Sequence, residues 1–219
     1  RDFCLSRGLG DVYKRQRANL ARITDEIAGA GRDPGEVEIL AAVKYVPAGG
    51  LKSLADAGLG LLGENRAQDL VAKADAFPGR FTWDFIGRLQ SRKVKTIVPY
   101  VRYIHSVDSD SVLAQLERHA RPDTEVLVEV NIAEEPGKGG VQPADLSAFI
   151  DRCPVPVVGL MTMPPATSDP ENSRSYFAAL RKLAHEHGLK HLSMGTTQDY
   201  VVAAQEGATI VRIGTSLYR

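Results

Sequence analysis

The chain has 219 residues, of which 43% are hydrophobic and 25% are charged, and this predicts a single globular domain with one substantial core. Lys and Arg together number 27, and so do Asp and Glu, so the formal net charge is zero. That balance excludes a general attraction to nucleic acid or to an anionic membrane surface, so any anionic ligand must be bound locally.

Cysteine and histidine usage gives no sign of a disulfide framework or of a metal site. Cys4 and Cys153 are too few and too far apart for a framework, and neither they nor the five histidines show metal-ligand spacing. No apolar stretch approaches the roughly 18 residues that cross a bilayer, and no signal-peptide pattern opens the chain. We therefore expect a cytoplasmic protein without a metal site.

Residues 1–16 (RDFCLSRGLGDVYKRQ) differ from the rest of the chain. They start without methionine, show no clear helical or strand period, and stop where an amphipathic helix begins. The string CLSRGLGDVYKRQ resembles translated adaptor sequence at the ends of some metagenomic gene models. We predict that residues 1–16 are a non-native leader and that the domain covers residues 17–219.

From residue 17 onward, short apolar runs alternate with helical patterns. The first helix is expected over residues 18–30, where Leu20, Ile23 and Ile27 share one face. The strands expected after it are 37–43, 59–62, 82–86, 101–105, 125–130, 155–160, 191–193 and 209–213. The helices expected between them are 50–57, 67–76, 90–97, 109–120, 143–152, 171–187 and 199–206.

Eight strands that alternate with helices are typical of a (β/α)8 TIM barrel, although a doubly wound open sheet shows the same alternation. The number of strands favours the barrel. In a barrel, the residues that directly follow the strands meet at one face and form the site, whatever their separation in sequence. The residues expected at that face are Lys44, Gly63, Gly87, Asn131, Met161, Ser193 and Gly214.

Lys44 directly follows the apolar run of residues 37–43, and Tyr45, Val46 and Pro47 break the strand after it. A lysine at a strand end can simply be solvated, because its side chain reaches water easily. At the end of a barrel strand, however, it would face the mouth of the barrel. A neutral lysine amine there can condense with an aldehyde to give a Schiff base, and burial favours the neutral form.

Two later segments have the composition of phosphate-binding turns. Residues 192–196 (LSMGT) and 211–216 (VRIGTS) each place glycine and hydroxyl residues next to an apolar run. Either turn alone is most often only a tight turn. Together, at the last two strands of a barrel, they match the place where that fold commonly binds phosphate. One amine and two phosphate-type turns predict pyridoxal 5'-phosphate (PLP) as the cofactor, with hydroxyls from Ser193, Thr196 and Thr215 at its phosphate.

Arg212 alternates with Val211 and Ile213 on the last strand, so its side chain points to the opposite side from theirs. One interpretation is an ion pair with a neighbouring helix. The other places a permanent guanidinium in the barrel, beside the pyridine nitrogen of the cofactor. That contact would keep the nitrogen unprotonated and weaken the ring as an electron sink.

Three further features have structural interpretations as well as functional ones. Asn65 precedes a predicted helix and could simply cap it. The aromatic strand that contains Trp83 and Phe85 is more typical of core than of a ligand site. Lys138, in a glycine-rich loop, is more typical of a solvated charge than of a second amine in the site.

Several segments together closely resemble the pyridoxal phosphate homeostasis protein family (YggS/PROSC), from about residue 17 to residue 218. The matching segments are 42–47 (AVKYVP), 63–68 (GENRAQ), 83–93 (WDFIGRLQSRK), 130–132 (VNI), 159–161 (GLM), 192–195 (LSMG) and 211–215 (VRIGT). Residues 196–199 (TTQD) depart from a more usual hydrophobic or serine-containing run.

The resemblance implies a barrel like the N-terminal domain of alanine racemase. It also implies that Lys44 carries the cofactor, that Arg212 faces the pyridine nitrogen, and that Asn65 lies near the ring. The residues that it implies for the phosphate are Ser193, Gly195, Gly214 and Thr215; Thr196 joins the predicted site from its position alone.

Alanine racemase shares the barrel, the lysine and the arginine, but it completes its site with a second, β-rich domain that supplies a catalytic tyrosine. Only six residues follow Ile213, so we expect no such domain here. An open site would expose a carbanion to water. The resemblance therefore implies a monomeric carrier that takes part in PLP (vitamin B6) homeostasis without a recognised reaction of its own. Apo PLP-dependent enzymes are candidate partners, and a racemase-like enzyme is the alternative.

Overall fold

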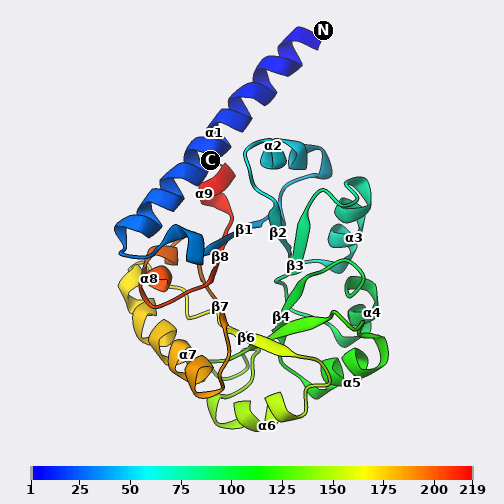
Figure 1. The fold of residues 1–219 in the computed structure, drawn as a ribbon, viewed down its shortest axis with the longest axis vertical. Helices are drawn as coiled ribbons and strands as arrows, with labels where there is room; N and C mark the ends of the chain where they lie inside the picture. The colour runs from blue at the N-terminus through cyan, green and yellow to red at the C-terminus, as the bar shows by residue number, and fades with distance from the viewer. Residues whose placement is uncertain (1, 219) are drawn as a thin grey trace.

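The computed structural model describes the backbone of residues 2–218 and the side chains of residues 13–218, and it forms a closed barrel of parallel strands in the order β1 to β8 (Figure 1). The strands are β1 (Glu38–Ala42), β2 (Leu61–Glu64), β3 (Thr82–Phe85), β4 (Tyr103–Val107), β5 (Glu125–Glu129), β6 (Val157–Met161), β7 (His191–Thr196) and β8 (Ile210–Ile213). The helices are α1 (Asp2–Gly29), α2 (Leu51–Asp56), α3 (Ala67–Ala76), α4 (Val94–Ile97), α5 (Asp110–His119), α6 (Leu146–Asp151), α7 (Arg174–Glu186), α8 (Tyr200–Gln205) and α9 (Thr215–Tyr218). The predicted (β/α)8 barrel is confirmed.

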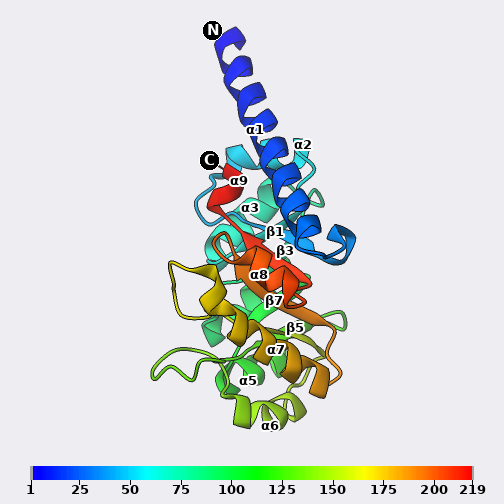
Figure 2. The ribbon, with the colours of Figure 1, turned by 90° about the vertical axis from the view of Figure 1, so that its left-hand side faces the viewer.

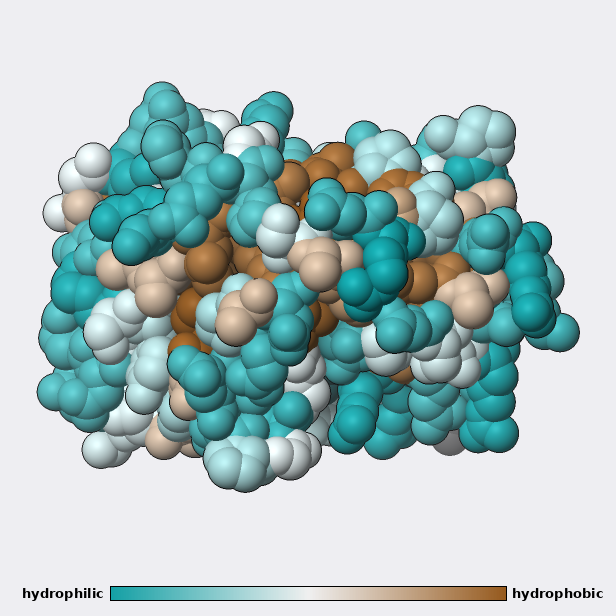
Figure 3. All heavy atoms as spheres, turned by 90° about the horizontal axis from the view of Figure 1, so that it is seen from below, coloured by the Kyte–Doolittle hydropathy of each residue, from teal (hydrophilic) through white to brown (hydrophobic). Residues whose placement is uncertain are grey.

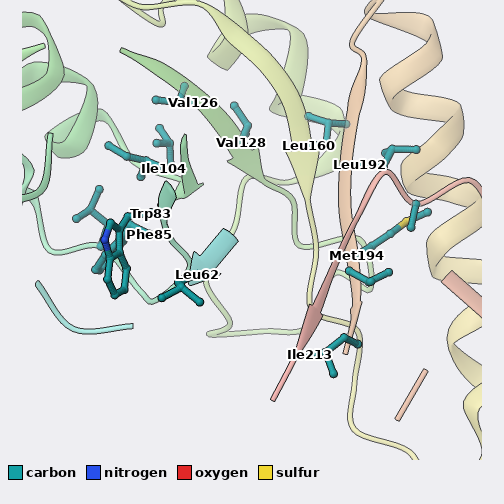
Figure 4. Close-up of a cluster of buried hydrophobic side chains, with 14 of the residues drawn as sticks. Leu62, Trp83, Phe85, Ile104, Val126, Val128, Leu160, Leu192, Met194 and Ile213 are labelled. Atoms are coloured by element: carbon teal, nitrogen blue, oxygen red, sulfur yellow. The ribbon is translucent and has the colours of Figure 1, made fainter. Parts of the chain in front are cut away.

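The main hydrophobic core lies between the strands and the surrounding helices (Figure 4). Strand side chains such as Val126 and Val128 pack outward into it, and Trp83 belongs to the same cluster. The core interpretation of this tryptophan is therefore correct. Leu127, which alternates with the two valines, is fully buried but does not belong to that cluster. Burial on both faces explains why the strands read as continuous apolar runs.

The structure corrects the prediction for the N-terminal residues. Helix α1 is one continuous helix from Asp2, where no regular structure was expected before residue 17. No proline interrupts this segment, and it contains several strong helix formers. In Figures 1 and 2 the N-terminal half of α1 extends away from the barrel, whereas Ile23 and Ile27 in its C-terminal half are fully buried. The non-native origin of residues 1–16 stays a prediction.

A second difference concerns β7, which continues to Thr196, three residues past the predicted end. Thr196 pairs there with Arg212 of β8, after a register shift between the two strands. Ser193 and Gly195 therefore lie within a strand and not in a turn that follows it. This difference matters for the site, because side chains within a barrel strand can point inside the barrel.

The outer surface seen in Figure 3 is largely hydrophilic, with hydrophobic side chains visible in the gaps between polar ones. Within the described residues, no helix combines the length and the apolar character that crossing a membrane requires. The described side chains also include no group of three or more His, Cys, Asp or Glu that could share a metal ion.

Gly159 on β6 allows a close approach of neighbouring strands, and its replacement by alanine should destabilise the barrel. A Cβ atom at this position would overlap the carbonyl oxygen of His191 and lie 2.6 Å from its Cβ. We expect Gly159→Ala to lower the free energy of unfolding by about 3 kcal/mol in a urea titration. Gly60→Ala is the control, because a Cβ there meets no atom within 4 Å. Equal stability of the two variants would contradict this account.

Candidate functional site

The carboxyl ends of the barrel strands surround a cavity of about 680 Å³. A site at this end is the general rule for the fold, and the volume is typical of a small-molecule pocket. Six predicted site residues line the cavity, namely Lys44, Asn65, Thr196, Arg212, Gly214 and Thr215. Two others, Ser193 and Gly195, do not.

Lys44 projects from a tight turn at the cavity mouth. The turn is closed by the Val46 N–H, which donates to the Val43 carbonyl oxygen at 2.9 Å. The Lys44 side chain is exposed, and its Nζ lies 5.0 Å from the centre of the Tyr45 ring. Among the described residues, Nζ has no hydrogen-bond or ion-pair partner. The structure therefore presents a primary amine at the edge of the cavity, as the strand pattern predicted, but without the burial that was expected to favour its neutral form.

A buried ion pair lies beneath this turn, and it was not found from the sequence. Lys73 of α3 pairs with Glu64 at the end of β2, and it also donates to the Val43 carbonyl oxygen at 2.8 Å. Glu64 in turn accepts from the backbone N–H of Asn65 at 2.7 Å. The pair thus ties the Lys44 turn to the segment that carries Asn65. Glu64 is completely buried and the Lys73 side chain is only 9% exposed, so both charges depend on each other.

Asn65 does not cap the following helix, so the capping interpretation is wrong. Helix α3 has Arg66 at its N-cap position, without a side-chain capping hydrogen bond. Asn65 instead lines the cavity, and its Oδ1 atom is buried without a hydrogen-bond partner in the described structure. Because an unsatisfied buried acceptor is costly, this atom is suited to accept a hydrogen bond from a ligand.

The ends of β7 and β8 form a neutral edge of the cavity. The Gly214 N–H donates to Thr197 Oγ1 at 3.2 Å, which holds the two segments together. Thr215 is the first residue of α9, so its N–H precedes the first hydrogen bond of this helix, from the Leu217 N–H to the Gly214 carbonyl oxygen at 3.0 Å. Thr197 lines the cavity beside them and was missed, although the hydroxyl directly after the predicted turn was a usable signal. These groups can donate to a phosphate without any lysine.

Thr196 contributes less to this edge than predicted, because both of its donors are already used. Its N–H and its hydroxyl both donate to Asp199 Oδ1, at 2.7 and 3.1 Å. Gly195 has a packing role in the fold: its φ is +86°, and a Cβ there would lie 2.5 Å from the Ala203 Cβ. A glycine is therefore needed for β7 to pack on α8.

Arg212 is buried, and it reaches the cavity from inside the barrel, as the strand alternation predicted. It pairs with no carboxylate among the described residues, so the alternative of an ion pair with a helix is wrong. Nη1 donates to the Ser193 carbonyl oxygen at 2.6 Å, and Nη2 donates to the Thr162 carbonyl oxygen at 2.8 Å. Burial lowers the pKa of Arg212 to about 10, so the guanidinium stays charged at neutral pH.

Ser193 lies on the inner side of β7, fully buried and outside the cavity lining. Its Oγ is engaged by Arg212 Nη1 at 2.6 Å and by His105 Nδ1 at 2.8 Å. The lining thus gives no support to a direct phosphate contact by Ser193 or by Gly195. The sequence pattern could not distinguish a hydroxyl inside the barrel from one at its mouth, because β7 was predicted to end at Ser193.

The opposite wall of the cavity is charged, and it also was not anticipated. Arg88, Asp108 and Glu129 follow or end β3, β4 and β5. Burial raises the pKa of Glu129, and the nearby Asp108 carboxylate raises it further. Lys138, in the loop after β5, forms an ion pair with Glu135 and does not line the cavity, which supports the loop-charge interpretation.

Removal of Lys73 should destabilise the protein strongly, because it leaves the Glu64 charge buried without its cation. We expect Lys73→Met to lower the free energy of unfolding by about 3 kcal/mol. The double variant Glu64→Gln with Lys73→Met should recover much of that loss, and Lys52→Met, at an exposed pair, should change stability by less than about 1 kcal/mol. Urea titrations measure all three. An equal loss in the single and double variants would show that the pair is not coupled.

Comparison with known proteins agrees with the family resemblance, although no family model matches the chain. The pyridoxal phosphate homeostasis protein of Aquifex aeolicus is 40% identical over 213 residues, 91% of this chain and 93% of that protein. PipY of Synechococcus elongatus PCC7942, solved with PLP bound, is 30% identical with a TM-score of 0.76, over 90% of this chain and 100% of that one. A lysine/ornithine decarboxylase of Vibrio vulnificus shares only the fold, with a TM-score of 0.69 at 13% identity over 94% of this chain and 62% of its own. The identity and coverage of the first two show that the chain belongs to the pyridoxal phosphate homeostasis protein family.

Proposed function

We propose that this protein binds PLP in the cavity at the carboxyl ends of the barrel strands and serves PLP homeostasis as a carrier. The observation that carries the proposal is the placement of an unpaired amine, Lys44, at the mouth of a cavity that Arg212 and the Thr197–Gly214 edge also line. A relative with the same barrel, PipY, has been solved with PLP bound. When bound, PLP supplies an aldehyde that can form a Schiff base with the Lys44 amine.

The residues of the cavity fit this cofactor. Asn65 Oδ1 is a buried acceptor without a partner, which a hydroxyl or another donor on the ligand would satisfy. The backbone and hydroxyl donors of Thr197 and Thr215 suit a phosphate dianion. Arg212 can only donate, so it suits an unprotonated pyridine nitrogen. Each polar part of the cofactor therefore has a chemically matched group on the cavity wall.

The names of the relatives support a carrier over a racemase-like enzyme. The relatives that match nearly the whole chain are named as homeostasis proteins, whereas the decarboxylase neighbour is only 13% identical. We further propose that the protein acts in the cytoplasm as a monomer, and that apo PLP-dependent enzymes receive its cofactor.

Replacement of Lys44 tests whether its amine is the tether that holds PLP as a Schiff base. We expect the wild-type protein, mixed with PLP and freed of excess ligand, to show the absorbance band of an imine, and Lys44→Ala to show none. Lys52→Ala is the matched control, because Lys52 is an exposed lysine that pairs with Asp56 on α2, away from the cavity. Borohydride reduction followed by peptide mass mapping should place the label on Lys44. A wild-type band that survives in Lys44→Ala would reject this residue as the tether.

The carrier and the enzyme make opposite predictions for turnover and transfer. We expect the loaded protein to restore activity to an apo PLP-dependent enzyme faster than release of PLP into buffer allows, since a carrier transfers its cofactor directly. A reagent that traps free PLP in the buffer should therefore not abolish the transfer. Assays with a panel of L-amino acids should show no racemisation above the background of free PLP. Racemisation that disappears in Lys44→Ala would favour the enzyme and reject the carrier.

A further inference from the structure

A continuous hydrogen-bond network crosses the interior of the barrel beneath the proposed PLP site. It starts at Arg212, whose Nη1 contacts Ser193 Oγ at 2.6 Å, and continues from Ser193 Oγ to His105 Nδ1 at 2.8 Å. His105 Nε2 then contacts Asp84 Oδ2 at 3.1 Å. All four residues are at most 5% exposed, and they come from β8, β7, β4 and β3. The network is therefore part of the barrel interior and shielded from water.

The network continues to the opposite end of the barrel, where the amino ends of the strands lie. Asp84 accepts from Arg102 Nε at 3.1 Å and from Arg102 Nη2 at 2.7 Å. Arg102 also donates to both carboxylate oxygens of Glu38, at 2.8 and 3.1 Å. Burial alone would raise the pKa of Asp84, but the hydrogen bonds from His105 and Arg102 outweigh it and leave this pKa lowered. Asp84 is thus an ionised acceptor that is anchored on its far side.

The chemistry of the two ends fixes the direction of every hydrogen bond between them. Arg212 can only donate, so Ser193 Oγ accepts from it. Ionised Asp84 can only accept, so the single hydrogen of a neutral imidazole sits on His105 Nε2 and leaves Nδ1 as an acceptor. Ser193 Oγ therefore donates its hydrogen to Nδ1. Burial lowers the pKa of His105, which agrees with a neutral ring.

The arrangement matters for Arg212 because no carboxylate among the described residues holds this guanidinium. Two backbone carbonyls, Ser193 Oγ and, at 2.9 Å from Nη2, Met163 Sδ hold it instead. If the Ser193 hydroxyl turned its hydrogen toward Arg212, a donor would face a donor and the contact would be lost. The acceptor on His105 prevents that turn. A protonated His105 would also place a second positive charge in the barrel interior, close to Arg212.

We propose that Ser193 and His105 are positioning residues for the PLP site, which orient Arg212 and so hold the pyridine nitrogen of the bound cofactor unprotonated. This inference rests on the proposed function, because Arg212 acts here on bound PLP. It assigns to Ser193 a role inside the barrel, in place of a direct contact with phosphate. His105 acts only through Ser193 and touches neither the cavity nor its ligand.

The first test measures the tautomer of His105 without cofactor. In a long-range ¹H–¹⁵N NMR spectrum of histidine-labelled protein, we expect His105 to be neutral with its hydrogen on Nε2. The Ser193→Ala variant should shift the Nδ1 signal, because Nδ1 loses its donor, and should leave His191 unchanged. A hydrogen on Nδ1 in the wild-type protein would overturn the proposal.

The second test follows the visible absorbance of bound PLP as a function of pH. We expect Ser193→Ala to move the titration midpoint by about one pH unit and to weaken PLP binding about tenfold, as for one lost hydrogen bond to a charged group. His105→Leu should behave like Ser193→Ala. His105→Gln should remain close to wild type, because its amide can accept from Ser193 and donate to Asp84. His191→Gln is the control, since His191 lies on the same strand as Ser193 but is not part of the hydrogen-bond network.

The possible outcomes separate this inference from the proposed function. Absence of any PLP band in the wild-type protein would overturn the proposed function and the inference with it. A wild-type band together with a wild-type titration in folded Ser193→Ala would overturn the inference alone. Should His105→Leu fail to fold, the comparison of Ser193→Ala with His105→Gln still decides, because equal effects of these two variants contradict the proposed direction of the hydrogen bonds.

Discussion

Burial of the Arg212 guanidinium is the constraint on which the interior of this barrel depends. A charge away from water must be fully hydrogen-bonded, and here no carboxylate among the described residues contacts it. The carbonyl oxygens of Ser193 on β7 and of Thr162, directly after β6, accept from the guanidinium. In the proposed network the requirement extends to His105, whose neutral ring takes the Ser193 hydrogen and so keeps it from pointing toward Arg212. One buried cation thus determines side-chain chemistry on three other strands.

The cavity above this cation has two chemically different sides. The edge formed by Thr197, Gly214 and Thr215 offers neutral donors, whereas Asp108 and Glu129 belong to a charged wall. A phosphate held by N–H groups and hydroxyls is bound by dipoles, without the strong attraction of a lysine or arginine cluster. Such a site agrees with a chain of zero net charge, and it suits a protein that must release its cofactor as well as bind it.

Lys44 has an exposed side chain on a backbone segment that is held by hydrogen bonds. Its side chain extends to solvent at the mouth, yet the carbonyl oxygen of the preceding residue is held by Lys73, which is itself paired with buried Glu64. The backbone under the amine is therefore rigid while the amine remains accessible. An open, well-anchored amine is what a reversible tether requires, whereas an enzyme that stabilises a carbanion would need a site closed to water.

The sequence by itself was sufficient for the eight strands, for the barrel, and for Lys44, Asn65, Arg212, Gly214 and Thr215 at one face, because apolar runs and the residues that end them are local patterns. Tertiary structure alone decided the rest. Glu64 and Lys73 meet by the packing of α3 on β2, and His105 meets Ser193 across 88 residues. No local pattern shows such pairs, since strand register and the true end of β7 determine which side chains share the barrel interior. The sequence neighbours of Ser193 predicted a phosphate contact, whereas its contact with a buried arginine is visible only in the tertiary structure.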